Sequence, residues 1–368
     1  MDLGFQDARV IVTGGASHIG RTIVLGFAAE GARIALVDKD EVQANRTAEE
    51  ARAAGAVHVS VVPADLTIRE EAEQAMQASL AALDGVDVLV NNVGSNRPAF
   101  FLDTPPESWD HLIHLNLSSC MWCMRAVLPS MQAQGSGAIV ATTSTAAFGE
   151  PRQGVYGAAK AGVISIVRSV ALEYGRYGIR ANLVAPGLVL PEDEDTMGEM
   201  SLWRDRDAVM NENQITYVKR NTPLRRLSRP EDIANAVLFL ASDRSARQLT
   251  GQMLTVSGGF AVNLTSSGGN GNVIYATAFP ANGLSNLDLR LYDEAGNTEI
   301  SSDTFVADNT SDRESFVHTA AAAGDDRTVE YLGTNFFAFF DAAVHIDRIA
   351  DLKIRKFFFE TAAFYKIH

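Results

Sequence analysis

The sequence has little cysteine, a deficit of positive charge and no long apolar run. Its 368 residues include two cysteines, and 31 basic residues stand against 45 acidic ones, which gives a formal net charge of −14. This balance argues against nucleic acid or an anionic membrane as a partner, because both attract basic surfaces. Since no run of about 20 apolar residues occurs and the chain opens without a signal-peptide pattern, we expect a cytoplasmic protein that does not span a membrane.

The two cysteines, Cys120 and Cys123, form a C-x-x-C in SSCMWCMRAV. Metal and redox sites share this spacing. The stretch has helical periodicity, however, and no second pair of ligands lies nearby in the sequence. We therefore interpret both as buried thiols that pack as small apolar side chains, and we expect no metal site.

What the chain does contain is an alternation of strand-like and helix-like segments over about 260 residues. Short apolar runs separated by helical lengths are ARVIVTGG, ARIALVDKD, VHVSVVPADL, VDVLVNNVG, GAIVATTS and IRANLVAPG. Apolar strands with helices between them imply a parallel sheet that is covered on both faces. We predict an α/β domain over residues 1–262 with a doubly wound parallel sheet, which binds its ligands at the carboxyl ends of the strands.

The first polar cluster, TGGASHIG at residues 13–20, joins the first strand to the first helix. Glycines there let the main chain approach a pyrophosphate, and the helix N-terminus adds free amides and a positive dipole. A plain tight turn is the alternative. The second strand ends in Asp38, about 20 residues on, where an acid that binds adenosine ribose usually lies. Its carboxylate would repel a 2′-phosphate and so favours NAD over NADP, although the adjacent Lys39 softens that repulsion.

Further polar and turn residues follow the later strands, and VYGAAKAG places Tyr156 and Lys160 one helical turn apart on one face. Each feature alone is ordinary turn or surface chemistry, but their order along the chain indicates a site. The candidates after the third to sixth strands are Asp65, Leu66, Asn91, Asn92, Gly94, Ser144, Pro186 and Gly187.

With these motifs, about residues 5–262 resemble the short-chain dehydrogenase/reductase family. The resemblance rests on TGGASHIG, NNVG, YGAAK, the PG pair and TGQMLTVSGG, with Asp38, Asp65, Asn116 and Ser144. It implies a Rossmann-like fold, a nicotinamide cofactor and hydride transfer at an alcohol or carbonyl carbon. The cofactor-binding residues that it implies are Gly14, Ser17, His18, Ile19, Gly20, Asp38, Asp65, Leu66, Asn92, Gly94, Tyr156, Lys160, Pro186 and Gly187.

The catalytic candidates are Ser144, Tyr156, Lys160 and Asn116. Oxidation of an alcohol requires a group that accepts the hydroxyl proton, and a tyrosine with a pKa of about 10 is a poor base at neutral pH. We expect Lys160 and the oxidised nicotinamide to lower the pKa of Tyr156, which then is the general acid/base. Lys160 would also hold the nicotinamide ribose, and Ser144 would stabilise the substrate oxygen. The resemblance implies that Asn116 holds a water beside the lysine.

Two departures from the family pattern affect the site. His18 stands where the motif usually has its second glycine. We interpret it as a tolerated side chain that turns from the pyrophosphate and bonds a phosphate or a nearby backbone group, since histidine accepts positive φ more easily than bulky residues. The loop before Tyr156 is one residue shorter than is common in the family. Thr143 would match the usual count, but Ser144 is preferred for its place at the strand end.

The substrate is less clear from the sequence. The long connection over residues 188–225 predicts a lid, and Phe100 and Phe101 are candidates for an apolar wall. Met197, Met200, Leu202 and Trp203 either line the pocket or anchor the lid. We favour a secondary alcohol or ketone with apolar or alicyclic character, and a homo-oligomer, either dimer or tetramer. The alternatives are a sugar or polyol dehydrogenase and a non-catalytic dinucleotide-binding protein.

The family pattern ends near residue 262, about a hundred residues before the end of the sequence. Residues 263–272, NLTSSGGNGN, are typical of a linker. Short alternating runs over residues 273–368 predict a smaller all-β domain, a sandwich or jelly roll of unknown role. A carbohydrate-binding module is one hypothesis for it, because aromatic residues gather in FFAFFD and FFFETAAFY. Core or subunit packing is the other reading of those aromatics.

Overall fold

The computed structural model describes residues 2–191, 196–205 and 209–260, and also the main chain of five strands between residues 274 and 333. The chain divides into two compact units, Met1–Thr265 and Ser266–His368. The predicted linker at 263–272 and the aromatic segments after residue 333 lie outside the described residues.

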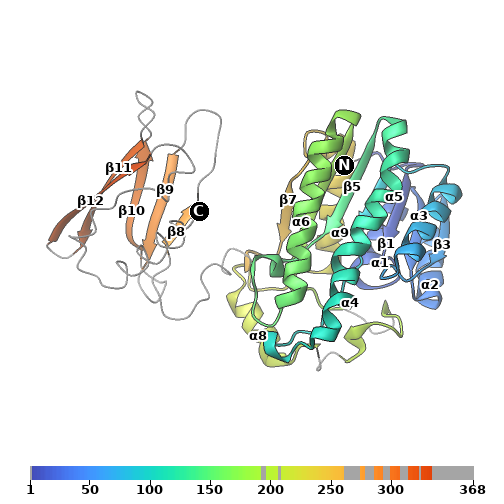
Figure 1. Ribbon diagram of the computed structural model, residues 1–368, viewed down its shortest axis with the longest axis horizontal. Helices are drawn as coiled ribbons and strands as arrows, with labels where there is room; N and C mark the ends of the chain where they lie inside the picture. Colours follow the sequence, from blue (N-terminus) through green and yellow to red (C-terminus); the bar gives the residue numbers. More distant parts are fainter. Residues whose placement is uncertain are drawn as a thin grey trace. The chain divides into compact units, whose positions relative to one another are not determined.

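The first unit is built on one seven-stranded sheet with the order β3-β2-β1-β4-β5-β6-β7 (Figure 1). Every neighbouring pair in it is parallel. The strands are β1 (Arg9–Thr13), β2 (Arg33–Asp38), β3 (His58–Pro63), β4 (Val88–Asn91), β5 (Gly137–Thr142), β6 (Ile179–Pro186) and β7 (Met253–Val256). This is the doubly wound, Rossmann-like sheet that the sequence predicts.

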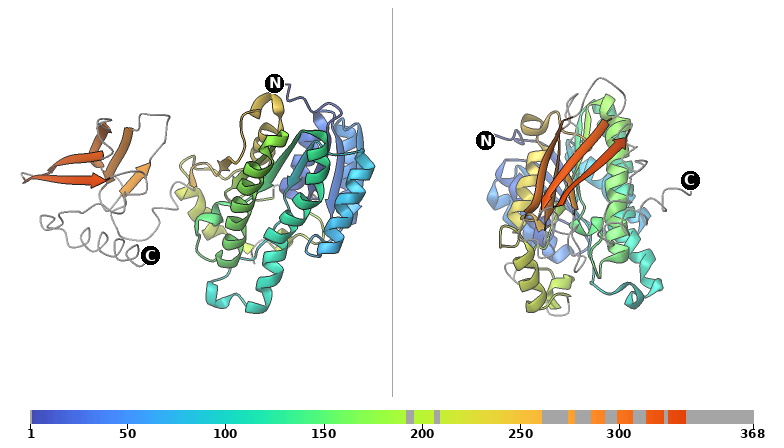
Figure 2. Two further views of the ribbon diagram at one scale, coloured as in Figure 1. Left: turned by 45° about the horizontal axis from the view of Figure 1, so that its top comes forward. Right: turned by 90° about the vertical axis from the view of Figure 1, so that its left-hand side faces the viewer.

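Helices cover both faces of the sheet, so consecutive strand residues are buried on opposite sides (Figure 2). In β1, for example, Val10 and Val12 pack with one helical layer and Ile11 with the other. The first layer holds α1 (His18–Ala29), α2 (Glu41–Ala54) and α9 (Pro230–Ala241); the second holds α3 (Arg69–Leu83), α5 (Ser119–Gln134) and α6 (Gly154–Tyr174). Shorter helices are α4 (Trp109–Ile113), α8 (Glu212–Asn221) and α10 (Asp243–Ala246).

The strand order reverses between β1 and β4, which are neighbours in the sheet although α1, α2 and α3 separate them in sequence. Thr13 at the end of β1 pairs with Val37 of β2 and with Asn91 of β4. The chain segments that follow these three strands therefore leave the sheet at the same edge. A crevice at such a reversal is where open α/β sheets bind their ligands.

Two buried features of the second layer concern predictions from the sequence. Cys120 and Cys123 of α5 are free thiols with exposures of 8% and 0%, as we interpreted them, and burial raises the pKa of Cys120 to about 12. The stretch Gly154–Tyr177, which contains α6, is long and apolar enough to cross a membrane by composition. Its Val163, Val167 and Val170 instead pack in the core beside the sheet.

The second unit contains antiparallel strands among its described residues. One sheet has the order β10-β9-β8, and a separate pair joins β11 to β12. The strands are β8 (Ile274–Thr277), β9 (Asn286–Tyr292), β10 (Glu299–Val306), β11 (Glu314–Ala322) and β12 (Asp325–Gly333). The sandwich or jelly roll, and its role, remain predictions.

Candidate active site

The turn after β1 folds so tightly that it has no room for side chains at two glycines. Gly14 has φ +64°, and a Cβ on Gly20 would lie 1.8 Å from the carbonyl oxygen of Gly14. The amide of Asn92, at the end of β4, donates to that same carbonyl at 3.1 Å. The helix α1 begins here with no acidic residue in its first turn. A glycine turn without side chains, followed by a helix N-terminus with no nearby acidic residue, fits the pyrophosphate of a dinucleotide.

Asp38 lies beside this turn. Its two carboxylate oxygens accept hydrogen bonds from the amides of Ala16 and Asp40, each at 3.0 Å. Burial raises the pKa of Asp38, and the hydrogen bonds from Asp40 and Ala16 oppose that shift. The carboxylate is thus fixed in the position that a ribose-binding acid needs, and the exposed Lys39 follows it. These residues fit an adenosine ribose.

His18, the departure from the glycine motif, has the positive φ that the motif's glycine would supply, 51°. Burial lowers the pKa of its imidazole to about 4, against a hydrogen bond with the Leu190 backbone that raises it. The ring is therefore uncharged at neutral pH. Its Nε2 is buried and has no hydrogen-bond partner among the described residues, so the expected bond to a phosphate or to a backbone group at this atom stays a prediction.

Ser144 and Tyr156 meet at the end of β5. Ser144 begins a 3₁₀ turn, Thr145–Phe148, whose geometry turns the chain back toward the first turn of α6, where Tyr156 lies. A hydrogen bond joins the side chains of Ser144 and Tyr156. Thr143 is directed elsewhere, since its hydroxyl donates to the Lys160 carbonyl at 2.8 Å. The structure thus brings Ser144, and not Thr143, to the tyrosine.

Lys160 lies under the Tyr156 ring with an exposure of 3%. Its Nζ is 5.9 Å from the ring centroid and donates to the carbonyls of Thr142 at 3.0 Å and Val93 at 3.5 Å. Burial lowers the pKa of the Lys160 ammonium to about 8. These two hydrogen bonds fix the ammonium in place.

Asn116 is buried beside the lysine. A Cβ on Gly94 would lie 2.7 Å from Lys160 Nζ and 2.8 Å from Asn116 Oδ1, so both side chains flank this glycine. Asn116 exchanges hydrogen bonds with the main chain of Ser95 at 3.0 and 2.9 Å. It lies in a π-helical turn, His114–Ser118, that joins α4 to α5. Such turns occur frequently at functional sites, and sequence periodicity gives no signal for them.

The remaining predicted residues have mainly structural surroundings. Asp65 accepts hydrogen bonds from the amide and hydroxyl of Thr67 at 2.9 and 2.8 Å; burial raises its pKa, but these bonds leave it lowered overall. Leu66 is buried in the core. Ser17 is the N-cap of α1, and Ile19 packs on the core of the first layer. Pro186 ends β6, and Gly187 bonds the carbonyl of Val256 at 3.0 Å.

The pKa of Tyr156 is not lowered in the protein without its cofactor. That Lys160 and the oxidised nicotinamide together lower it stays a prediction. Burial raises the pKa of Tyr156 to about 12; the Ser144 hydrogen bond lowers it and the negative charge of Glu150 raises it further. The spacing argument counted the charge of Lys160 but not the desolvation of the phenol, which opposes ionisation. We therefore expect the pKa to fall only when the positively charged nicotinamide lies beside the tyrosine and adds its charge to that of Lys160.

Glu150 is a residue that the sequence reasoning missed. It follows the 3₁₀ turn and accepts a hydrogen bond from the Thr145 hydroxyl at 2.6 Å. Burial raises the pKa of its carboxyl, against that hydrogen bond. The sequence signal was weak, because GEP at residues 149–151 is typical of an exposed turn.

Replacing Glu150 with Gln should move the pH dependence of alcohol oxidation to lower pH. The substitution removes a negative charge that raises the pKa of Tyr156 and keeps an acceptor for Thr145. Because oxidation speeds up as the tyrosine loses its proton, the rising limb of kcat against pH shifts downward. Glu173→Gln, an exposed position at the far end of α6, is the matched control. A shift to higher pH, or one equal to the control's, would contradict this role.

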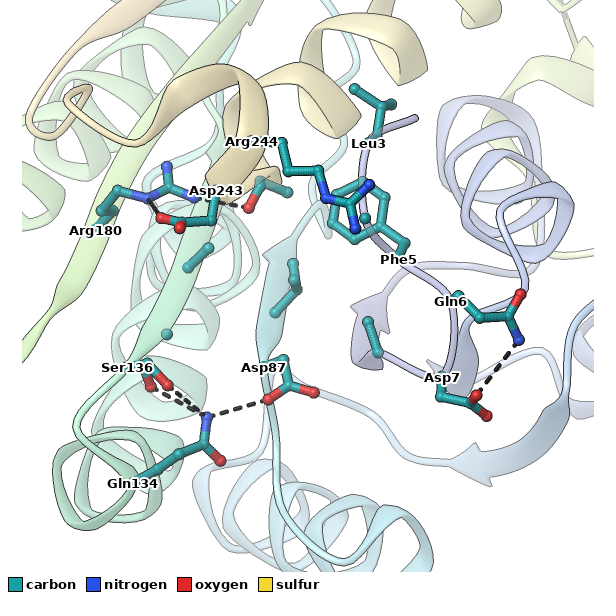
Figure 3. A pocket seen from close by; sticks show the side chains of 16 residues that line it. Leu3, Phe5, Gln6, Asp7, Asp87, Gln134, Ser136, Arg180, Asp243 and Arg244 are labelled. Atoms are coloured by element: carbon teal, nitrogen blue, oxygen red, sulfur yellow. Dashed lines mark hydrogen bonds and ion pairs between the residues drawn. The ribbon is translucent and has the colours of Figure 1, made fainter. Parts of the chain in front are cut away.

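A cavity of about 570 Å³ lies at the opposite, amino-terminal edge of the sheet (Figure 3). Its polar side chains largely pair with one another: Arg180 contacts Asp243 at 3.8 Å, and Gln134 donates to Asp87 at 3.1 Å. Ligands of parallel sheets bind at the carboxyl ends of the strands. Since the catalytic candidates gather at the carboxyl ends, we do not assign a substrate to this cavity at the other edge.

Known proteins share the fold and much of the sequence of the first unit. Residues 14–261 match the family model described as enoyl-(acyl carrier protein) reductase. The subunit BbsD of a (2S)-[(R)-hydroxy(phenyl)methyl]succinyl-CoA dehydrogenase from Thauera aromatica is 34% identical, covering 70% of this chain and 98% of its own. The 3-oxoacyl-[acyl-carrier-protein] reductase FabG of Staphylococcus epidermidis is also 34% identical, covering 68% and 97%.

A solved structure, 7α-hydroxysteroid dehydrogenase with NADH and 7-oxo glycochenodeoxycholic acid, matches with a TM-score of 0.64. It is 32% identical and covers 70% of this chain and 96% of its own. The fold and the polar residues at the carboxyl edge of the sheet define a class of protein, the nicotinamide-dependent oxidoreductases that act on CH–OH groups. The chain belongs to the short-chain dehydrogenase/reductase family.

Proposed function

We propose that this protein is an NAD(H)-dependent oxidoreductase that transfers hydride between nicotinamide and a secondary alcohol or ketone, with Tyr156 as general acid/base. The observation that carries the proposal is a chain of contacts near the glycine turn. Ser144 bonds Tyr156, the Tyr156 ring lies over Lys160, and Lys160 flanks Gly94 together with Asn116. The glycine turn would hold a dinucleotide, which would supply or accept the hydride. The residues of the chain then handle the proton and the substrate oxygen.

In ketone reduction the Tyr156 hydroxyl donates its proton to the substrate oxygen, and in alcohol oxidation the phenolate accepts it. The Ser144 hydroxyl, already bonded to the phenol, orients the same oxygen and stabilises negative charge on it. Lys160, largely charged at pH 7 because its pKa is about 8, stabilises the phenolate and holds the nicotinamide ribose. Asn116 keeps the Ser95 main chain beside Lys160.

The fixed carboxylate of Asp38 supports NAD over NADP, since it would accept from ribose hydroxyls and repel a 2′-phosphate. The related 7α-hydroxysteroid dehydrogenase was solved with NADH. We propose that the remaining cofactor contacts are made by the glycine turn, Asn92, Gly94 and Pro186–Gly187, because these lie at or after the carboxyl ends of β1, β4 and β6.

Exposed aromatic side chains on segments that adjoin the first turn of α6 and Ser144 support an apolar or alicyclic substrate. Phe100, Phe101 and Phe148 are 62%, 59% and 51% exposed. Phe101 lies 3.1 Å from where a Cβ on Gly154 would be, in the first turn of α6, and Phe148 belongs to the turn that Ser144 begins. Apolar rings around an otherwise polar site favour a hydrocarbon-rich substrate over a sugar.

A panel of ketones tests this function, with the consumption of NADH and NADPH followed by absorbance. We expect turnover with NADH, and a higher kcat/KM for alicyclic and oxoacyl ketones than for keto sugars. No turnover of any ketone, nor of the matching alcohols, with either dinucleotide would contradict the proposal. Faster turnover of sugars or polyols would instead favour the alternative substrate class.

We also propose a cytoplasmic homo-oligomer, either a dimer or a tetramer. Apolar side chains exposed on the second helical layer support it: Met121 of α5 is 41% exposed and Leu172 of α6 is 86% exposed. Light scattering on the purified full chain measures the mass of the assembly directly.

A further inference from the structure

The described part of the connection after β6, residues 196–205, packs against the predicted adenosine end of the dinucleotide site. A Cβ on Gly198 would lie 2.1 Å from Asp40 Oδ2, so its main chain rests directly on this carboxylate. Gln43 of α2 donates to the Thr196 carbonyl at 3.4 Å. Arg204 ties the segment to itself through the carbonyls of Gly198 and Met197, at 3.1 and 3.0 Å. The segment is thus a folded unit seated on the N-terminus of α2.

A second contact joins this segment to the glycine turn. The Trp203 ring lies 5.9 Å from the His18 ring, centroid to centroid, at an interplanar angle of 56°. A glycine at position 18 would offer no side chain for this contact. Because the imidazole is uncharged at neutral pH, the two rings meet as an aromatic pair, a geometry that adds stability beyond the area buried.

Three buried polar atoms lie where the segment meets the glycine turn and α2. His18 Nε2, Asp40 Oδ2 and Gln43 Oε1 are buried and have no hydrogen-bond partner among the described residues. Buried polar atoms are normally paired, and each orphan has a free-energy cost. Gly198 already covers Asp40 Oδ2, so His18 Nε2, at the glycine turn, is the orphan atom that points to a ligand there.

We propose that residues 196–205 form a clasp over the bound dinucleotide, and that the contact between Trp203 and His18 is the latch that slows its release. The proposal rests on the proposed function, since it takes the ligand bound at the glycine turn to be NAD(H). His18 and Trp203 are positioning residues in it. They hold the cofactor and take no part in proton transfer.

The test is the dissociation rate of NADH from the full chain, measured by stopped-flow fluorescence while excess NAD⁺ displaces it. Trp203→Ala should raise the dissociation rate about two- to tenfold, the range expected for the loss of one aromatic pair, and leave association nearly unchanged. Trp203→Phe is the matched control, because it keeps an aromatic ring and should retain most of the slow release. His18→Gly, which restores the family's glycine, should accelerate release to a similar extent.

The double variant distinguishes a latch from two independent effects. With His18 already replaced by Gly, Trp203→Ala should add little, because the partner ring is gone. Thermal melting of each variant checks that the fold is intact. The clasp is wrong if Trp203→Ala leaves the dissociation rate unchanged, or if the two effects multiply. Wild-type protein that binds neither NADH nor NADPH would contradict the proposed function itself, and the clasp with it.

Discussion

Replacing Tyr156 with Phe lowers kcat for both alcohol oxidation and ketone reduction by about 10²- to 10⁴-fold, the usual contribution of a general acid/base. The phenylalanine keeps the ring that packs over Lys160 and removes only the hydroxyl that exchanges a proton with the substrate. NADH affinity, measured by fluorescence titration, should therefore change little. Steady-state kinetics at saturating dinucleotide measure the loss.

The matched control is Tyr174→Phe, in the last turn of the same helix, where the ring packs on Tyr177 at a centroid distance of 6.2 Å. It removes an identical hydroxyl far from Ser144 and should leave kcat unchanged. Retained turnover in Tyr156→Phe would refute the assignment of the general acid/base. A parallel loss of NADH binding would instead indicate that the hydroxyl supports the cofactor site.

The second large effect concerns Asp38 and the choice of dinucleotide. Wild-type protein should use NADH with a higher kcat/KM than NADPH, and Asp38→Ala should reduce that preference about 10- to 100-fold. The reason is the loss of charge-assisted hydrogen bonds to the ribose, worth about 1.5–3 kcal/mol, together with relief of the repulsion of a 2′-phosphate. The ratio of kcat/KM values for the two dinucleotides measures the change.

Two further variants separate charge from hydrogen bonding at this position. Asp38→Asn can accept from only one of the two amides that bond the carboxylate, those of Ala16 and Asp40, because it has a single acceptor oxygen. It carries no charge but can still bond a ribose hydroxyl, so it should gain NADPH activity with a smaller loss of NADH activity than Asp38→Ala. Lys39→Ala removes the cation that softens the repulsion and should sharpen the preference for NADH. If the wild-type protein has a kcat/KM for NADPH equal to or higher than that for NADH, the argument from Asp38 is overturned.

The parts of the site that sequence could predict are those set by local order along the chain. A glycine turn after an apolar strand and an acid at the end of the next strand, Asp38, follow from short segments of regular length. The adjacency of Tyr156 and Lys160 follows from helical spacing. Parallel strands then carry these segments to one edge of the sheet, and the structure has them there.

The parts that it could not predict depend on contacts between distant residues. Lys160 Nζ bonds the carbonyl of Val93, 67 residues away, and His18 meets Trp203, which lies far along the chain after β6. The π-helical turn at Asn116 is set by its packing and not by periodicity. The raised pKa of Tyr156 depends on burial and on Glu150, which no spacing of tyrosine and lysine contains.

The most direct measurement is the ultraviolet absorbance of tyrosinate as a function of pH, taken as the difference between wild-type protein and Tyr156→Phe. Without dinucleotide the phenol should remain protonated until near pH 12. With saturating NAD⁺, the added positive charge should bring its ionisation to a clearly lower pH, and Lys160→Met should reverse much of that shift. An unchanged ionisation when NAD⁺ is bound would contradict the account of how this site moves a proton.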